Sequence, residues 1–203
     1  MDKSDYNNLI DRDKRVVDLV RSSGVITREQ IQKAIFGEVH INVPIRRLKF
    51  LVENKHIKRD FYNIEGHTNS YVYYVGKKPS KRTLSHNLMI AEFIARVYTL
   101  SEVVEANANY RIGNIISDCY IKYKGSDGRV RHLFLEVQLS NRVIDCTEKY
   151  NDIKNIILDE KPRWKTIPRL IVITDLPHQD EQMKNLKVKY DTTQMENLRG
   201  ILF

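Results

Sequence analysis

Apolar residues near the N-terminus recur at helical spacing in two successive segments. The first segment, 7–22, has a broad apolar face and is followed by Gly24, a residue suited to the position after a helix end. The second segment, 28–36, follows Thr27, and Gln30 three residues later completes a capping box. We therefore expect two helices, whose buried faces comprise Leu9, Ile10, Val16, Val17, Leu19 and Val20 in the first and Ile31, Ala34, Ile35 and Phe36 in the second.

A third helix is predicted to begin near Asn42, a good N-cap residue, with Pro44 in its first turn, where the missing N–H costs nothing. Residues 56–63 then alternate as a strand does, 65–70 contain turn-forming Gly and Asn, and 71–75 supply a return strand. The pattern predicts a helix followed by a β-hairpin, with the inward stripe of the helix formed by Ile45, Leu48, Leu51 and Val52.

The second half of the chain alternates between helical and strand-like patterns. It begins with a helix over 85–100, capped by Ser85. The expected elements that follow are strands at 110–116, 119–124 and 131–139, with a tight turn at 125–128, then a helix over 143–159, a buried strand at 169–174, a helix at 179–185 and an edge strand at 200–203. This order predicts an α/β (α+β) arrangement with a mixed sheet.

Composition places the chain among ordinary globular proteins, with 41% hydrophobic and 30% charged residues. No apolar run approaches the roughly 18 residues of a membrane span, and the first residues lack the apolar core of a signal peptide. Cys119 and Cys146 have no metal-ligand spacing. We expect a cytoplasmic protein with free thiols, no membrane association and no organic cofactor.

Positive charge is concentrated in the first part of the chain. The net charge is +8, and residues 1–83 account for +7 of it. A basic segment favours a polyanionic partner, because phosphate contacts release counterions and dominate affinity. The three helices and the hairpin resemble the winged helix-turn-helix fold, which we assign to residues 1–78 and which implies that the third helix enters the major groove of double-stranded DNA.

Basic side chains fall on the elements that this resemblance assigns to the DNA interface. Arg46, Arg47 and Lys49 point away from the inward stripe of the third helix, and Lys58 and Arg59 lie on the hairpin. The stretch 76–83 reads either as a simple solvated linker or as a strap that contacts phosphates. The expected DNA-binding residues are Arg46, Arg47, Lys49, Lys58, Arg59, Lys77, Lys78, Lys81 and Arg82, and the alternative is a solvated basic face.

Two acidic residues in the second half occupy positions suited to chemistry. Asp118 falls where one predicted strand ends and the next begins, and Glu136 interrupts an apolar strand. A hairpin through 125–128 would bring the two side by side. Carboxylates are hard ligands suited to Mg²⁺ or Mn²⁺, and the backbone carbonyl of Val137 could supply a third oxygen.

The segment with Ser117–Asp118, a hairpin and then Glu136–Val137–Gln138, enclosed by helices and a strand, resembles the PD-(D/E)xK nuclease fold, an α-β-β-β-α-β core assigned to 84–203. A winged helix joined to such a core, with Lys149–Tyr150 on the next helix, resembles the replication-relaxation family, including MobC-type relaxases of mobilisable plasmids. The resemblance implies that Asp118 and Glu136 are metal ligands, with Gln138 and Lys149 in the catalytic set.

Two positions depart from the pattern of the nuclease family. Ser117 replaces a proline that is not a ligand, and Gln138 replaces a lysine that offsets developing charge, which a neutral amide does poorly. Lys149 could supply the missing cation from a displaced position. Otherwise the core is inactive and serves binding or homodimerisation.

Each candidate also has a structural interpretation. Asp118 could be a turn or cap residue, Glu136 could pair with Arg131 or Lys122, Gln138 could face solvent, and Lys149 could lie on a solvated helix face. Glu92 could complete the acid set or pair with Arg96 at i,i+4. His86 could be a general base or a phosphate contact, or a structural histidine at a helix N-terminus. Tyr110, Tyr120, Tyr123 or Tyr150 could act as a nucleophile or simply pack. The remaining histidines are expected at the surface: His40, His56, His67, His132 and His178.

These observations lead to an expected function with two alternatives. We expect a DNA-binding protein that acts on plasmid or mobile-element DNA as a metal-dependent nickase or relaxase-like endonuclease. The first alternative is a non-catalytic regulator of transcription or replication, in which a degenerate nuclease-like core mediates dimerisation. A nuclease of mobile-element or defence type without origin specificity is the second.

Overall fold

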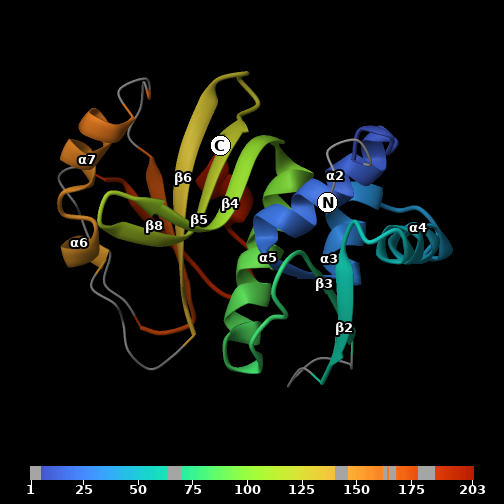
Figure 1. Cartoon of the computed structure of the whole chain (residues 1–203). Coiled ribbons are helices and arrows are strands. Elements are labelled where there is room, and N and C mark those ends of the chain that lie inside the picture. The colour runs from blue at the N-terminus through green and yellow to red at the C-terminus, as the bar shows by residue number, and fades with distance from the viewer. Residues whose placement is uncertain (1–5, 64–69, 140–145, 162–163, 165–167, 178–185) are drawn as a thin grey trace. The chain divides into compact units, whose positions relative to one another are not determined.

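The computed structural model describes residues 6–63, 70–139, 146–161, 164, 168–177 and 186–203 (Figure 1). It confirms a mixed α/β protein with a five-stranded mixed sheet and a separate three-stranded sheet. The chain divides into two compact units, Met1–Thr99 and Leu100–Phe203, and each is described by itself. No helix among the described residues is long and apolar enough to cross a membrane.

The first predicted helix is α2 (Asp11–Ser23), which ends at Gly24 with a φ of +74°. Its predicted face is buried over Val16, Val17, Leu19 and Val20. Ile10 was expected in this stripe, but it precedes the helix in an extended conformation and is 52% exposed.

The predicted capping box at the second helix is confirmed. Thr27 Oγ1 accepts a hydrogen bond from the Gln30 N–H at 3.2 Å, and Gln30 Oε1 accepts one from the Thr27 N–H at 3.0 Å. The helix itself is α3 (Arg28–Ile31), continued by the wider π-helical turn η1 (Gln32–Phe36). The start of this element therefore follows from local sequence, while its change in pitch does not.

The third helix is α4 (Asn42–Glu53). Asn42 is the first helical residue, and Ile41 occupies the cap position without a side-chain hydrogen bond, so the predicted N-cap was wrong by one residue. Pro44, Leu48 and Leu51 form the buried face. Ile45 was expected there, but it lies one residue round the helix from Pro44 and is 42% exposed.

The predicted hairpin consists of β2 (Lys58–Tyr62) and β3 (Ser70–Tyr74), paired antiparallel. A short strand that the sequence did not predict, β1 (Val25–Thr27), pairs with the other edge of β3. Three residues are too few to display a period of two. Most of the expected turn at 65–70 lies outside the described residues.

The helix predicted over 85–100 is α5 (Leu84–Leu100), which groups with the N-terminal unit. A 3₁₀ turn, η2 (Lys81–Thr83), leads into it, so Ser85 lies inside the helix and is not its cap. Gln30 Nε2 donates to the carbonyl oxygen of Leu88 at 2.9 Å. The small core of the three-stranded sheet also includes the start of α5, through Val25, Tyr62, Val72, Leu84 and Leu88.

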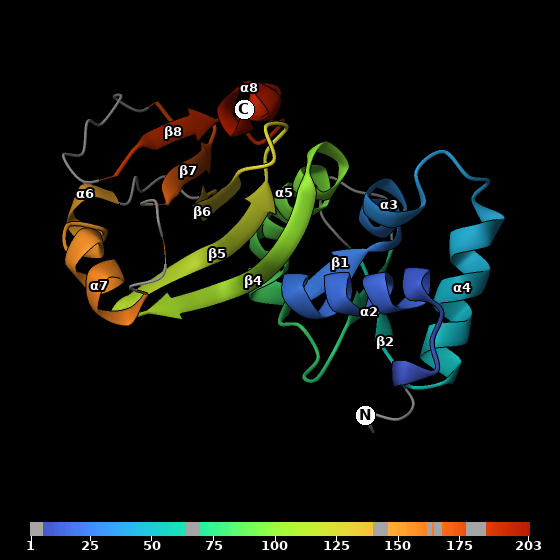
Figure 2. The same cartoon turned by 90° about the horizontal axis from the view of Figure 1, so that it is seen from above.

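The C-terminal unit is built on one sheet with the strand order β4-β5-β6-β7-β8 (Figure 2). The strands are β4 (Glu102–Ile112), β5 (Ile115–Lys124), β6 (Val130–Gln138), β7 (Arg169–Thr174) and β8 (Val188–Asp191). β4, β5 and β6 are antiparallel, and β6, β7 and β8 are parallel. The mixed sheet and the buried strand at 169–174 are thus confirmed, and the predicted turn at 125–128 joins β5 to β6.

Several boundaries in this unit differ from the prediction. The strand expected at 110–116 is interrupted by a turn at Gly113, whose φ is +55° and where a Cβ atom would lie only 2.9 Å from the Ile156 side chain. The helix expected over 143–159 is divided into α6 (Cys146–Lys149) and α7 (Ile153–Glu160), with Asn151 and Asp152 in the turn between them. Such residues favour turns over helix interiors.

The chain end also differs from the prediction. Residues 200–203 were expected to form an edge strand, but 198–202 form the helix α8 (Leu198–Leu202). The side chains of Tyr123 and Arg169 donate to its carbonyl oxygens. The last strand of the sheet is β8, which the sequence did not predict, and the helix expected at 179–185 lies outside the described residues.

Candidate functional site

Asp118 and Glu136 project from the same face of the five-stranded sheet. In the antiparallel register, Cys119 pairs with Leu135 and Tyr120 pairs with Phe134. Because side chains alternate along a strand, Asp118 shares a face with Tyr120, and Glu136 shares it with Phe134. The sequence predicted this juxtaposition, although Asp118 lies within β5 and not between two strands.

At one end of the β5–β6 pairing, hydrogen bonds with side chains of β5 replace the backbone hydrogen bonds between the two strands. The last paired residues at this end are Cys119 and Leu135. Beyond them, Asp118 Oδ2 accepts a hydrogen bond from the Val137 N–H at 2.8 Å, and the buried Ser117 hydroxyl points to the Leu135 carbonyl oxygen at 3.0 Å. Asp118 therefore has a fixed position at the fork between the two strands.

Glu136 is 2% exposed and is held by two neighbours from the segment that follows β6. Lys149 Nζ lies 2.7 Å from both carboxylate oxygens, and the Tyr150 hydroxyl donates to Oε1 at 2.5 Å. The side chain of Lys149 keeps 26% of its surface exposed. The buried carboxylate thus has a cation and a hydroxyl as partners, which buried charge requires.

Packing fixes the position of Tyr150. This residue is fully buried in the core on that face of the sheet, and its ring lies 5.8 Å from that of Phe134. Ile153 and Ile157 of α7 belong to the same core, and Figures 1 and 2 show α6 and α7 together on one side of the sheet. The packing of Tyr150 in this hydrophobic core therefore places Tyr150 and the adjacent Lys149 beside Glu136.

The environment of Glu136 opposes its ionisation. Burial, and then the charge of nearby Asp118, raise the pKa of Glu136 above its ordinary range, and the hydrogen bonds from Lys149 and Tyr150 offset only part of this effect. A buried acid with a raised pKa beside a second acid and a lysine is typical of functional sites, although structural ion pairs perturb pKa values too.

The structure decides between some of the alternative interpretations. Arg131 pairs with Asp127 at 2.9 Å, so it is not the partner of Glu136. Gln138 is 4% exposed, on the same face as Glu136 and beside Thr174, so the solvent-facing interpretation is wrong. Lys149 forms an ion pair with Glu136, so it does not lie on a solvated helix face.

The donor set suits a hard divalent ion by chemical type, since Asp118 and Glu136 offer carboxylate oxygens. Both oxygens of Glu136 already accept hydrogen bonds from Lys149, so an ion that bound Glu136 would compete with the Lys149 ammonium. Among the residues that the structure describes, no three His, Cys, Asp or Glu side chains are grouped to hold a metal.

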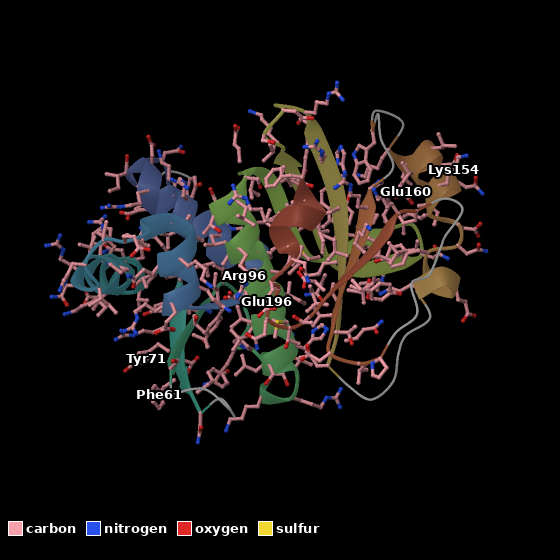
Figure 3. All side chains as sticks on the ribbon, turned by 180° about the vertical axis from the view of Figure 1, so that it is seen from behind. Phe61, Tyr71, Arg96, Lys154, Glu160 and Glu196 are labelled. Atoms are coloured by element: carbon pink, nitrogen blue, oxygen red, sulfur yellow. The ribbon has the colours of Figure 1, made fainter. Side chains whose placement is uncertain are left out.

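The secondary candidates have structural roles where their contacts are given. Glu92 pairs with Arg96, as the spacing predicted, at 2.7 Å, and also with Lys33 at 2.6 Å. Arg96 is labelled on α5 in Figure 3. Burial alone would raise the pKa of Glu92, but these two cations hold it below its ordinary range. His86 lies in α5 of the same unit.

An aromatic stack occupies the face of the sheet that carries Glu136. The Trp164 ring stacks on those of Tyr120 and His132, at 5.2 and 4.5 Å between centroids, and Tyr110 stacks on Tyr120 at 4.5 Å. His132 Nδ1 and the Tyr120 hydroxyl are 2.8 Å apart. His132 is therefore buried, contrary to the expected surface position, and Tyr120 is a packing residue. His56, which was also expected at the surface, is buried as well.

In the N-terminal unit, α4 presents Arg46 and Lys49 on its exposed side. Arg47 does not join them. Its guanidinium pairs with Asp13 of α2, with Nε 3.1 Å from Oδ1, and Asp13 is fully buried. The expected outward position of Arg47 was wrong, because an uncompensated buried carboxylate would cost more than a solvated arginine gains.

The basic strap after β3 is anchored to the hairpin. Lys78 pairs with Asp60 at 2.6 Å, Lys58 Nζ donates to the Gly76 carbonyl oxygen at 2.9 Å, and the Tyr62 hydroxyl donates to that of Pro79 at 2.7 Å. The strap therefore has fixed contacts, unlike a simple linker. Lys77, Lys81 and Arg82 are exposed along it.

Three contributors to these sites escaped the sequence analysis. Tyr150 was considered as the neighbour of Lys149 and as a possible nucleophile or packing residue, but not as a partner of Glu136, although its spacing to Ile153 and Ile157 marks the buried stripe of a helix. No local sequence pattern indicated that Asp13 is buried in an ion pair, because its partner Arg47 is distant in sequence. Ser117 was treated as a tolerated replacement, yet its hydroxyl contacts the β6 backbone.

Comparison with known proteins gave no relatives: no protein-family model, curated protein or solved structure matches this chain.

Proposed function

We propose that the chain is a DNA-binding protein in which the N-terminal unit is a winged helix-turn-helix and the β2–β3 hairpin is its wing. The support is the order of elements, with α2, β1, α3, α4 and then the hairpin, and a three-stranded antiparallel sheet of order β1-β3-β2. In that fold the helix at the position of α4 enters the major groove.

The exposed side of α4 suits this role. Arg46 and Lys49 are exposed there, while Leu48 and Leu51 anchor the opposite side in the core. The strap adds Lys77, Lys81 and Arg82, and the wing adds Lys58 and Arg59. In this proposal Arg47 supports α4 through Asp13 and does not contact DNA.

We further propose that the C-terminal unit is a PD-(D/E)xK-type centre that cleaves a phosphodiester, as a nickase or relaxase-like endonuclease would. One observation carries this proposal: the ammonium of Lys149 lies 2.7 Å from both oxygens of Glu136, on the sheet face that also bears Asp118. Lys149 thus supplies the cation that Gln138 cannot.

Each residue would have a distinct role. Asp118 and Glu136 would hold Mg²⁺ or Mn²⁺, and the ion when bound would polarise the phosphate and lower the pKa of bound water. Lys149 would leave Glu136 and offset the negative charge that develops on the phosphate. Tyr150 would keep one oxygen of Glu136 oriented through its hydrogen bond. The side-chain amide of Gln138 would lie on the same face of the sheet as Glu136 and complete the polar lining of the centre.

The second candidate function is a non-catalytic regulator of transcription or replication. It is favoured by the engagement of both Glu136 oxygens, which makes the ion pair a complete structural unit without a metal. The sheet would then serve as a platform for a partner or for a second copy of the chain.

One experiment separates these functions. A DNA sequence selected by binding is placed on a supercoiled plasmid and incubated with the protein and Mg²⁺ or Mn²⁺. The nuclease proposal expects nicked circles, lost in Glu136→Gln and Asp118→Asn while DNA affinity is retained. If neither metal yields nicked product nor shifts the melting temperature, the regulator explains the protein better. If no DNA is selected, both proposals fail.

A further inference from the structure

Two aromatic rings on the β2–β3 hairpin face outward. Phe61 is 58% exposed and Tyr71 is 46% exposed. They are register partners across the two strands, and their ring centroids lie 5.4 Å apart in an edge-to-face arrangement. Figure 3 shows both side chains at the end of the hairpin, pointing away from the sheet.

The core does not require these rings. Side chains alternate along the hairpin, and the opposite face supplies Tyr62 and Val72 to the core that also holds Leu84 and Leu88. Large apolar side chains that stay exposed beside a well-packed face indicate a contact surface. The pair is therefore available to a partner.

The charges around the rings indicate the chemistry of that partner. The Arg59 guanidinium lies over the Tyr71 ring, 4.7 Å from its centroid, on the same face of the hairpin. Asp60 lies on the other face and is engaged by Lys78 and Tyr74. Among the described hairpin residues, the exposed face thus combines two rings and a cation without a carboxylate.

We propose that Phe61 and Tyr71 form a stacking platform for unpaired DNA bases at a junction between duplex and single strand, with Arg59 contacting the adjacent phosphate. This inference rests on the proposed DNA binding. An aromatic ring stacks on any base whose face is accessible, and a neighbouring cation complements the backbone. Base faces inside a duplex are covered, so the accessible ones lie at forks, ends and single strands.

The test compares three DNA molecules of shared sequence: a blunt duplex, a fork and a single strand. Affinity is measured by fluorescence anisotropy, and base stacking by the quenching of 2-aminopurine at the first unpaired position of the fork. Two double variants are compared with the unmodified chain. F61L/Y71L removes both rings, and the matched control F61Y/Y71F keeps a ring at each position.

We expect the unmodified chain and F61Y/Y71F to prefer the fork and to quench 2-aminopurine. F61L/Y71L should lose roughly tenfold in affinity for the fork, the effect of one lost stacked base, and about twofold at most for the blunt duplex. Circular dichroism and melting temperature verify that both variants fold, as the exposure of the rings leads us to expect.

Three outcomes would overturn the inference. They are an unchanged fork affinity in F61L/Y71L, an equal loss on fork and blunt duplex, and quenching that does not depend on the rings. In each case the variant Arg46→Ala tests DNA binding separately. If it still lowers the affinity for the blunt duplex, the proposed DNA binding stands although the stacking inference fails. If the unmodified chain binds none of the three molecules, DNA binding fails as well, and the exposed pair serves a protein partner.

Discussion

The Lys149 ammonium bridges both carboxylate oxygens of Glu136, at 2.7 Å each. Glu136 is 2% exposed, whereas Lys149 is 26% exposed. One partner is thus fixed in the core and the other can reach solvent. This asymmetry suits a lysine that exchanges the carboxylate for a phosphate, and it also suits a structural lysine that closes the end of a core.

Removal of the Lys149 charge should destabilise the C-terminal unit. Lys149→Met leaves a buried carboxylate without its cation, and we expect a loss of about 3 kcal/mol in the free energy of unfolding. Urea denaturation followed by Trp164 fluorescence measures this, because Trp164 is the only tryptophan and stacks on Tyr120 in the same unit.

Two controls accompany this prediction. Lys154→Met removes an exposed lysine from α7 and should change stability by less than about 0.5 kcal/mol. The double variant Lys149→Met with Glu136→Gln should recover part of the loss, since both charges are gone. A single variant as stable as the unmodified chain would show that the ion pair contributes nothing.

The raised pKa of Glu136 makes a specific prediction for pH. An acid whose pKa is higher in the folded than in the unfolded chain binds more protons when folded, so its contribution to stability falls as pH rises from its ordinary value of 4.5 to its folded value. We expect the stability of the unmodified chain relative to Glu136→Gln to decline over that window.

Denaturation at several pH values checks this difference. The comparison with Glu136→Gln is needed because Glu92 has a lowered pKa and works in the opposite direction, losing its contribution as pH falls. A difference that stays constant, or one that grows with pH, would contradict the assigned direction for Glu136.

Arg46 and Arg47 are adjacent in sequence but should behave differently. Arg47→Ala deprives the buried Asp13 of its partner, and we expect it to cost about 3 kcal/mol of stability. Arg46→Ala is an exposed substitution and should stay within about 0.5 kcal/mol. Thermal and urea denaturation of the two variants provide the measurement, and equal losses would refute the assignment.

The salt dependence of DNA binding tests the exposed side of α4. Each phosphate contact that is lost should reduce the slope of log affinity against log salt by about 0.9. We expect that reduction in Arg46→Ala and again in Lys49→Ala, measured by titration at several salt concentrations. Lys154→Met, in the other unit, serves as the control, and slopes identical to that of the unmodified chain would remove both residues from the interface.

Features encoded locally were predictable from the sequence. The Thr27–Gln30 capping box spans three residues and is present as expected. The apolar run 169–174 forms an interior strand with parallel neighbours on both sides. Local patterns also predicted that Asp118 and Glu136 lie side by side, because the turn at 125–128 leaves one simple way to pair the strands, although Asp118 was expected between two strands and lies within β5.

Features that depend on distant partners were not predictable. The inward turn of Arg47 follows from Asp13, a residue of another helix, and β1 becomes a strand only because β3 pairs with it. Likewise, Ser117 and Tyr150 acquire their roles from particular atoms of β6, the Leu135 carbonyl oxygen and the Glu136 carboxylate, and the sequence did not predict these contacts. The proximity of Lys149 to Glu136 was one of two open alternatives, and the packing of Tyr150 decides it.

The five-stranded sheet joins strands that lie at very different distances along the chain. β5 and β6 are connected by a tight turn, whereas pairing of β6 with β7 must close the whole segment 139–168. Closing the longer loop costs more entropy, so we expect the hairpin to form first. Asp118 and Glu136 then meet before Lys149, which lies within that segment, has docked. At that stage of folding the two neighbouring carboxylates have no counter-ion, so we expect refolding to be faster at a pH that protonates one of them.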